Sequence, residues 1–280
     1  MNTLLFNSTL VLYAFATATY LLYLLKPKPT LGRSARWLIT GGFLIHCAFT
    51  LHRYLEAGHT PITNLHESLS FFSLAIVGVF IAFERKYKVF ILGSFVTPLA
   101  LLLMVASSIY PSAIPQLPPA LKSNWLLIHS SLAFLSYATF AVAFGAAIMY
   151  LIQQHFLKRK RLGALYQKLP SLDILDEINY RCLTFGFPLL TIAIITGAIW
   201  AETAWGTYWS WDPKETWSLI TWFIYAALLH SRMTIGWRGK KAAILSIVGF
   251  FILLFTFLGV NLLPSESQHS YRQLLGGGVK

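Results

Sequence analysis

The sequence predicts an all-α fold, a polytopic membrane helix bundle of about eight transmembrane helices with both termini on the outer side. The first observation behind this prediction is composition, because 56% of the 280 residues are apolar and only 11% are charged. In soluble domains about a quarter of the residues are charged. The second is segment length, since a helix needs about 20 mostly apolar residues to cross a hydrocarbon core of about 30 Å. Eight apolar segments approach or meet this length: 4–25, 37–52, 65–83, 89–109, 125–151, 183–201, 217–231 and 242–261.

The positions of the basic residues predict how these segments cross the membrane, because Lys and Arg accumulate in cytoplasmic connections. Most of the 22 basic residues follow the first, third, fifth and seventh segments: Lys26, Lys28, Arg33, Arg36, Arg85, Lys86, Lys88, Lys158, Arg159, Lys160, Arg161, Lys168, Arg181, Arg232, Arg238, Lys240 and Lys241. The opposite side holds Arg53, Lys122, Lys214, Arg272 and Lys280. This alternation places both termini outside and explains the formal charge of +12. The basic composition therefore gives no argument for nucleic-acid binding.

The connections favour a single integral membrane domain over residues 1–280. Segment 4–25 is expected to be an uncleaved helix and not a signal peptide, because no Lys or Arg precedes it. The outer connection 110–123 contains four prolines and is not expected to be helical. The inner connection 152–182 is basic and then contains a Pro-Ser-Leu-Asp sequence that is typical of a helix start. A short interfacial helix is therefore predicted there.

The stretch 205–217 is the most specific part of the chain, because it contains four tryptophans and a tyrosine within thirteen residues. Its aromatic residues are Trp205, Tyr208, Trp209, Trp211 and Trp217. A membrane-spanning helix requires no such density, and an ordinary interfacial belt is sparser, so the stretch predicts a flat aromatic surface. Within it, Asp212-Pro213-Lys214-Glu215 has the pattern of an N-cap, a proline at N1 and a glutamate at N3. This pattern predicts a capping box that opens the seventh helix.

Two histidines flank the aromatic stretch along the chain and are expected on the same side of the membrane. His129 lies at the outer start of the fifth segment, one helical turn after Trp125, and His269 lies in the outer tail. Two neutral imidazoles beside aromatic side chains suit haem, whose iron accepts axial nitrogens on both faces of the ring. The site is therefore predicted to bind haem b non-covalently, with Lys214 meeting a propionate. The alternative is that His129 caps a helix and His269 is a solvated tail residue.

His230 is predicted to lie at a different depth. It follows Trp217 by thirteen residues, which corresponds to about 20 Å along a helix. An ionisable side chain in the inner part of a membrane requires a partner or a purpose. A second haem position nearer the cytoplasm supplies one, and an imidazole bonded to a neighbouring helix is the alternative. His46, closer to the membrane centre, is the weaker candidate for a ligand opposite His230.

The stretch from Trp205-Gly206 to Trp217, with Trp209, Trp211, Asp212, Pro213 and Glu215 in register, resembles the WWD signature of a superfamily of haem-handling proteins. The flanking histidines and segment 58–69 make the chain similar to the CcsA (ResC) family, the integral subunit of the system II cytochrome c synthase. This resemblance implies that His129 and His269 ligate haem beneath the WWD segment and that His230 receives haem nearer the cytoplasm. The residues expected to contact the cofactor are Trp125, Trp205, Gly206, Tyr208, Trp209, Trp211, Asp212, Pro213, Lys214 and Glu215. One departure is His66, where the family usually carries an aromatic residue.

The resemblance implies haem delivery and presentation for covalent attachment to the CxxCH motifs of apocytochrome c, with a CcsB-type membrane partner. The sequence contains no evident nucleophile or acid–base pair, so catalysis is expected to arise from positioning, and whether the chain is itself an enzyme stays open. The expected location is a bacterial plasma membrane, or a thylakoid membrane in a plastid. One alternative is a haem-binding regulatory or chaperone membrane protein of HemX type. Another is a transporter with an aromatic vestibule, for which acidic residues or broken helices at mid-membrane are expected.

Overall fold

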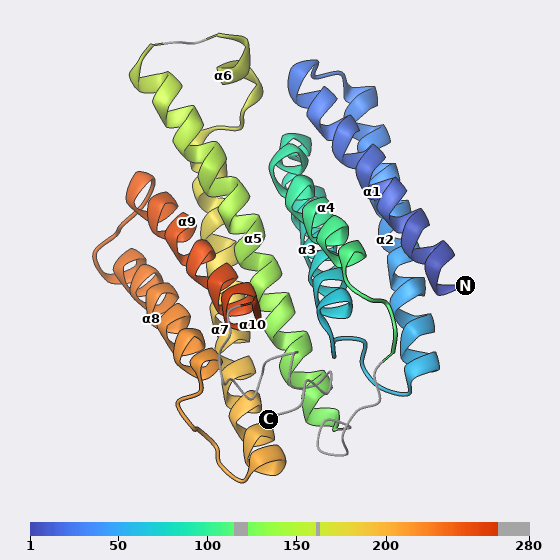
Figure 1. Cartoon of the computed structure of the whole chain (residues 1–280). Helices are drawn as coiled ribbons and strands as arrows, with labels where there is room; N and C mark the ends of the chain where they lie inside the picture. Colours follow the sequence, from blue (N-terminus) through green and yellow to red (C-terminus); the bar gives the residue numbers. More distant parts are fainter. Residues whose placement is uncertain (115–122, 161–162, 263–280) are drawn as a thin grey trace.

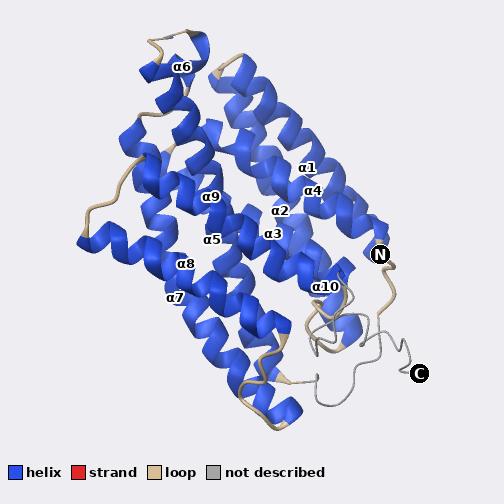
Figure 2. Ribbon diagram, turned by 60° about the vertical axis from the view of Figure 1, so that its left-hand side comes forward, coloured by secondary structure: helices blue, strands red, loops and turns tan. Residues whose placement is uncertain are grey.

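The computed structural model describes residues 1–114, 123–160 and 163–262, and all regular structure in these residues is helical (Figure 1, Figure 2). Eight long helices coincide with the eight predicted segments: α1 (Asn2–Leu25), α2 (Pro29–Ala57), α3 (Leu65–Tyr87), α4 (Gly93–Ile109), α5 (Asn124–Lys158), α7 (Leu172–Trp205), α8 (Pro213–Thr234) and α9 (Lys240–Leu254). Four short elements accompany them: the 3-10 turn η1 (Phe90–Leu92), α6 (Ala164–Lys168), the π-helical turn η3 (Phe255–Gly259) and α10 (Val260–Leu262). The all-α prediction is confirmed.

Within the described residues, six stretches are long and apolar enough to cross a membrane: α1, α3, η1 with α4, α5, α7 and α9 with η3. Helices α2 and α8 do not belong to this group. Both are long enough to cross a membrane, but they are less apolar than the other long helices. The protein is therefore an all-helical, polytopic integral membrane protein with about six candidate spans, fewer than the eight predicted from apolar segments alone.

Helix α5 lies at the centre of the molecule. It packs along α7 over much of their shared length and also contacts α3 and α9. On one side of it, α1 packs against α2 and α4, and α3 packs against α4. On the other side lie α7, α8 and α9 (Figure 1). Because α5 contacts both groups, it joins them into one bundle.

A cluster of four aromatic rings lies where α3, α5 and η3 meet. We call Phe72, Phe134, Tyr137 and Phe257 the four-ring cluster. The ring of Phe257 lies 5.5 Å from those of both Phe72 and Phe134, in edge-on arrangements, which is a favoured geometry for aromatic pairs. The π-helical turn carries Phe257, and the cluster forms the base of the site described below.

The start of α7 corrects one prediction about the connection 152–182. The Ser171 side chain accepts a hydrogen bond from the backbone N–H of Ile174 (3.4 Å), so the predicted helix start is present. The helix that begins there is α7 itself, which continues to Trp205, and is not a separate interfacial helix. The sequence lacks a break before 183 that would end it, and the short helix in this connection is α6, which precedes Ser171.

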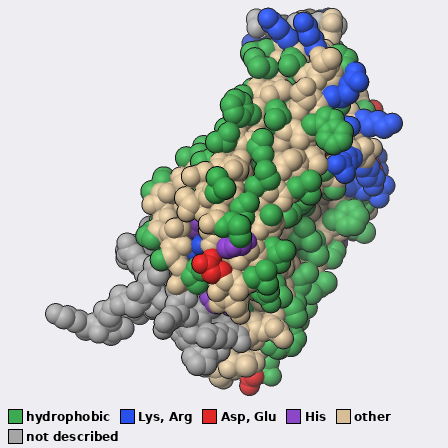
Figure 3. Space-filling view, turned by 90° about the vertical axis from the view of Figure 1, so that its right-hand side faces the viewer, with side chains coloured by type: hydrophobic (Ala, Val, Ile, Leu, Met, Phe, Trp, Pro, Cys, Tyr) green, Lys and Arg blue, Asp and Glu red, His purple; other side chains and the backbone are tan. Residues whose placement is uncertain are grey.

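The connections gather at two opposite ends of the bundle. The aromatic end contains the α2–α3 and α7–α8 connections, residues 58–64 and 206–212, and the basic end contains the α1–α2 and α8–α9 connections, residues 26–28 and 235–239 (Figure 1). Figure 3 shows Lys and Arg side chains gathered at the basic end. This segregation agrees with the charge pattern along the sequence.

Candidate functional site

A groove opens at the aromatic end between α5, α7 and the start of α8, with an empty volume of about 1220 Å³ that includes open solvent. Phe134, Tyr137 and Phe257 of the four-ring cluster line it, and the α2–α3 connection contributes Ile62 and Thr63. The end of α7, the connection after it and the first turns of α8 contribute Trp205, Tyr208, Trp209, Lys214, Glu215 and Ser218. An apolar groove with a few convergent polar groups is typical of a site for a small organic ligand.

His129 lies on α5 and contacts α7. Its Nδ1 is 2.7 Å from the carbonyl oxygen of Ala193, and its ring stacks on Trp200 with centroids 6.3 Å apart and planes at 23°. A carbonyl oxygen can only accept, so Nδ1 carries the proton and donates it. In the neutral ring the lone pair is then on Nε2, which is how a metal-ligating imidazole is oriented by its second hydrogen bond.

Gly197 permits this close approach of the imidazole to α7. A Cβ added at Gly197 would lie 2.7 Å from Cε1 and Nδ1 of His129. Ala193, Gly197 and Ala201 all line the groove, and sequence reasoning missed all three as site residues. Their signal was present in the sequence, because small residues at every fourth position are typical of membrane helices that pack closely.

The aromatic side chains at the groove do not form one flat surface as predicted. Trp200, a groove residue that the prediction also missed, is buried and lies 5.1 Å from Trp205 with ring planes at 59°. Trp209 and Trp211 lie 5.9 Å apart with planes at 88°. Edge-on and tilted contacts are preferred over parallel stacking of rings, because the ring edge is positive and the face negative. The aromatic residues therefore surround the groove from several directions.

The predicted capping box at the start of α8 is confirmed. The Asp212 carboxylate accepts a hydrogen bond from the Lys214 backbone N–H (2.8 Å), and the Glu215 carboxylate accepts one from the Asp212 N–H (3.2 Å). The same Glu215 oxygen also accepts from the Ser210 N–H (2.8 Å). Glu215 therefore fixes the tryptophan-rich connection to the first turn of α8.

Lys214 is the basic side chain of the groove and lies outside the predicted span 217–231. Burial lowers the pKa of Lys214 from 10.5 to about 8, and the Asp212 carboxylate opposes this shift. At neutral pH the side chain is therefore mainly protonated but titrates close to physiological pH. Together with the N-terminus of α8, it makes this part of the groove suitable for a carboxylate.

Five other predicted residues do not line the groove. Trp125 packs behind it in the tryptophan group that includes Trp200 and Trp205. Gly206 ends α7 with φ of 78°, in the left-handed region that favours glycine. Trp211, with φ of 59°, is 67% exposed, and Asp212 and Pro213 form the helix start.

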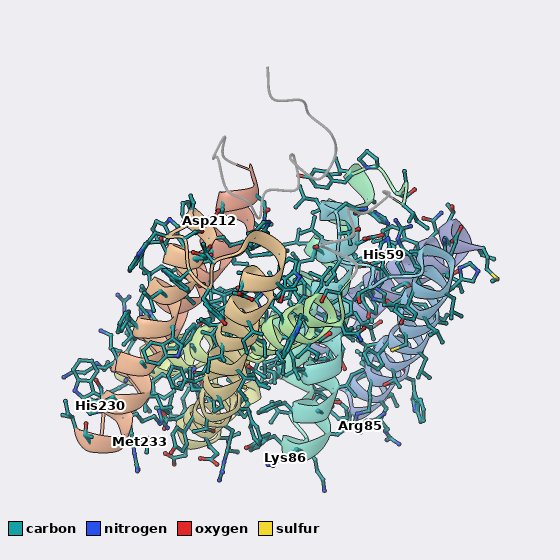
Figure 4. All side chains as sticks on the ribbon, turned by 90° about the horizontal axis from the view of Figure 1, so that it is seen from below. His59, Arg85, Lys86, Asp212, His230 and Met233 are labelled. Carbon is teal, nitrogen blue, oxygen red and sulfur yellow. The ribbon has the colours of Figure 1, made fainter. Side chains whose placement is uncertain are left out.

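Of the other two predicted iron ligands, His230 does not line this groove. His269 lies outside the described residues. His230 lies near the end of α8, with an exposed side chain. Figure 4 shows His230 and Met233 at the periphery of the bundle and Asp212 at the other end of the same helix. Of the predicted iron ligands that the structure describes, His129 lies beside the WWD segment and His230 does not.

Two further histidines have structural surroundings. His46 is fully buried, with Nδ1 3.1 Å from the Tyr13 hydroxyl and Nε2 2.9 Å from the Ser70 hydroxyl. Both ring nitrogens are thus engaged inside the α1–α4 group. His66 packs against two phenylalanine rings and has Nδ1 2.9 Å from the Ser107 carbonyl oxygen. It therefore retains the ring packing expected of an aromatic residue at this position.

These features define an integral membrane protein with a histidine-containing aromatic groove, and sequence comparison assigns the class. Residues 62–266 match the model of the family described as Cytochrome C assembly protein, and the chain belongs to this family. Its relatives are CcsA proteins. The Cytochrome c biogenesis protein CcsA of Guillardia theta is 42% identical over 241 residues, which cover 78% of this chain and 79% of the relative. The Cytochrome c biogenesis protein CcsA of Synechocystis sp. is 37% identical over 320 aligned residues, which cover 95% of this chain and 96% of the relative.

A solved structure supports the fold. The Cytochrome c Heme Lyase CcmF matches with a TM-score of 0.68 at 18% sequence identity. The match covers 99% of this chain and 49% of CcmF, so the chain spans about half the length of that protein. The resemblance predicted from the WWD segment is thus confirmed at the level of the family.

Proposed function

We propose that the groove at the aromatic end binds haem and presents it for covalent attachment to apocytochrome c. The observation that carries this proposal is the position of His129, an oriented imidazole in an aromatic groove beside the WWD segment. Cytochrome c biogenesis, the process named in the descriptions of the CcsA relatives, supplies the context. Haem is here the substrate that the protein hands on.

His129 is the first proposed axial ligand, through Nε2. The hydrogen bond from Nδ1 to Ala193 supports this role, because it fixes both tautomer and ring orientation. His269 is the second proposed ligand, and its assignment rests on the resemblance to the family. A pair of histidines would hold the iron from both faces of the ring.

The other groove residues are proposed to bind the porphyrin. Trp205, Tyr208 and Trp209 supply apolar contact area, and Lys214 supplies a cation for a propionate. The capping box keeps these residues at one helix start. Such a groove would orient haem so that its vinyl groups reach the thiols of a CxxCH segment, which is catalysis by positioning.

The attachment reaction requires little further chemistry from this chain. Each thioether forms when a cysteine S–H adds across a vinyl C=C bond, with sulfur joining one carbon and hydrogen the other. No group leaves, and neither partner is oxidised or reduced overall. The tasks of the protein are therefore to bind, orient and shelter the haem.

His230 is proposed to mark an inner haem position shared with a CcsB-type partner. Its side chain is exposed at the periphery of α8, so a second ligand can come from another subunit.

We propose eight membrane crossings, with the aromatic end and both termini on the outer side, in a thylakoid or bacterial plasma membrane. The distribution of Lys and Arg supports this orientation.

The absorption spectrum of the purified full-length protein tests haem binding. We expect a spectrum typical of two histidine ligands, which weakens in His129→Ala and in His269→Ala. His46→Ala controls for general damage, because His46 is buried away from the groove. A preparation that takes up no haem would contradict the proposal.

Reconstitution tests the attachment step. The protein is combined with a CcsB-type partner, haem and a reduced apocytochrome, and covalently attached haem is measured in the product. We expect attachment with the unaltered chain and its loss in His129→Ala. Haem binding without attachment under these conditions would favour a haem-binding regulatory protein.

A further inference from the structure

A buried ion pair joins α2 to α3 at the aromatic end. The Nε of Arg53 donates to Oε1 of Glu67 at 2.7 Å, and the two side chains are 3% and 0% exposed. No residue of this pair lines the haem groove. A charged pair that is removed from water requires good geometry and further hydrogen bonds, so the remaining contacts of the carboxylate are informative.

The second oxygen of Glu67 holds the α2–α3 connection. Oε2 accepts from the backbone N–H of Thr63 at 2.9 Å and from the Thr63 hydroxyl at 2.8 Å. Thr63 and its neighbour Ile62 line the groove opposite α7. Glu67 therefore does not line the groove but is hydrogen-bonded to a residue that does. One oxygen of its carboxylate contacts Arg53 and the other contacts Thr63.

Arg53 also fastens the residues that follow α4. Its Nη2 donates to the carbonyl oxygen of Ser112 at 2.8 Å. One guanidinium and one carboxylate thus fix parts of two different connections at the aromatic end. We call Arg53, Glu67 and Thr63 the clamp.

We propose that Glu67 is a positioning residue, which holds Ile62 and Thr63 as one side of the haem groove. This inference rests on the proposed function of the groove. An ionised carboxylate is required because both of its oxygens accept from donors, on Arg53 and on Thr63. A glutamine would present one oxygen and one NH₂, and the NH₂ would face a donor.

The chain contains a matched control on the same helix. Glu84, at the other end of α3, is also 0% exposed and pairs with an arginine of α2, with Arg36 Nη2 at 2.6 Å. Arg36 and Glu84 lie outside the groove lining. Glu84→Gln therefore alters an ion pair whose carboxylate is equally buried, although its arginine is 29% exposed, without disturbing Thr63.

The experiment compares Glu67→Gln and Glu84→Gln in the full chain by two measurements. The first is amide hydrogen exchange of residues 58–64, which reports on the clamp in the absence of haem. We expect exchange to accelerate in Glu67→Gln and to stay unchanged in Glu84→Gln. The second is haem titration, in which the dissociation constant is expected to rise by about threefold to tenfold in Glu67→Gln only.

A third variant, Thr63→Val, removes only the hydroxyl donor, so its effects should have the same direction and be smaller. Equal effects of Glu67→Gln and Glu84→Gln on both measurements would overturn the proposal, and so would unchanged exchange in Glu67→Gln. If the unaltered protein binds no haem, the proposed function fails, while the exchange comparison still decides whether Glu67 positions this connection.

Discussion

At the scale of single residues, the site depends on contacts that are too close to accommodate a larger side chain. His129 is held by one carbonyl oxygen at 2.7 Å and by a stacked indole. It can approach α7 because Gly197 has no side chain. The orientation of the proposed iron ligand is therefore set by residues that are not themselves proposed to bind the iron.

Gly197→Ala tests this dependence. The added methyl group would overlap the imidazole, and overpacking of this kind costs about 1–3 kcal/mol. We expect the ring of His129 to shift and the haem content of the purified protein to fall. Gly41→Ala is the control, because a Cβ at Gly41 meets no atom within 4 Å. Equal haem content in the two variants would show that the imidazole does not depend on Gly197.

The lowered pKa of Lys214 predicts a pH dependence of haem binding. Below its pKa of about 8 the side chain is charged and attracts a propionate, and above it this attraction is lost. Haem affinity should therefore decrease as pH rises from 7 to 9, and Lys214→Gln should flatten the profile. Between about 8 and 10.5 the unfolded chain binds the extra proton, so Lys214 adds stability as pH rises. Weaker haem binding at high pH could then not be attributed to unfolding caused by the titration of Lys214.

The control for Lys214 is Lys241→Gln, at the other end of the molecule, where Lys241 lies over the Trp237 ring. This variant should retain the pH profile of the unaltered protein. A haem affinity that stays constant between pH 7 and 9 in the unaltered protein would exclude Lys214 as the propionate partner.

At the scale of elements, the start of α8 and one face of α7 form the groove together. The capping box begins α8 at Pro213 and ties it to the connection through Glu215. The small residues of α7 allow α5 to approach, and these two helices form the most extensive packing contact in the described residues. Both features follow from local sequence patterns.

Substitutions of Asp212 separate capping from charge. Asp212→Ala removes the acceptor for the Lys214 N–H and should cost about 1 kcal/mol of stability. Asp212→Asn keeps an acceptor, because asparagine is an equally good N-cap. We expect thermal unfolding and haem titration to show a loss in the alanine variant and near-normal behaviour in the asparagine variant. Equal losses in both would indicate that the carboxylate charge itself is required.

At the scale of the whole molecule, hydropathy could predict where the eight long helices lie along the chain, because each of them contains one continuous apolar segment. The capping box at Asp212 could also be predicted, since it involves neighbours along the chain. The partner of His129 could not, because Ala193 becomes a neighbour only when α5 packs on α7. The same holds for the clamp, because Arg53 and Glu67 lie on different helices and become neighbours only when α2 packs on α3.

The proposed orientation predicts opposite accessibility of the two ends. Ser210→Cys and Arg238→Cys each add one thiol at an exposed position, in a chain in which both natural cysteines are replaced by alanine. A membrane-impermeant maleimide should label the first from the outer side and the second only after permeabilisation. The reverse pattern would invert the orientation and place the groove in the cytoplasm.

The lengths of α5 and α7 have a consequence for how the protein meets its surroundings. These helices have 35 and 34 residues, and 35 residues extend about 52 Å. Even at a tilt of about 40°, the steep limit for such helices, the longer one reaches about 40 Å along the bilayer normal, against a hydrocarbon core of about 30 Å. About 10 Å of this helix pair must therefore project beyond the lipid tails. A water-soluble polypeptide can meet the projecting part without entering the hydrocarbon core.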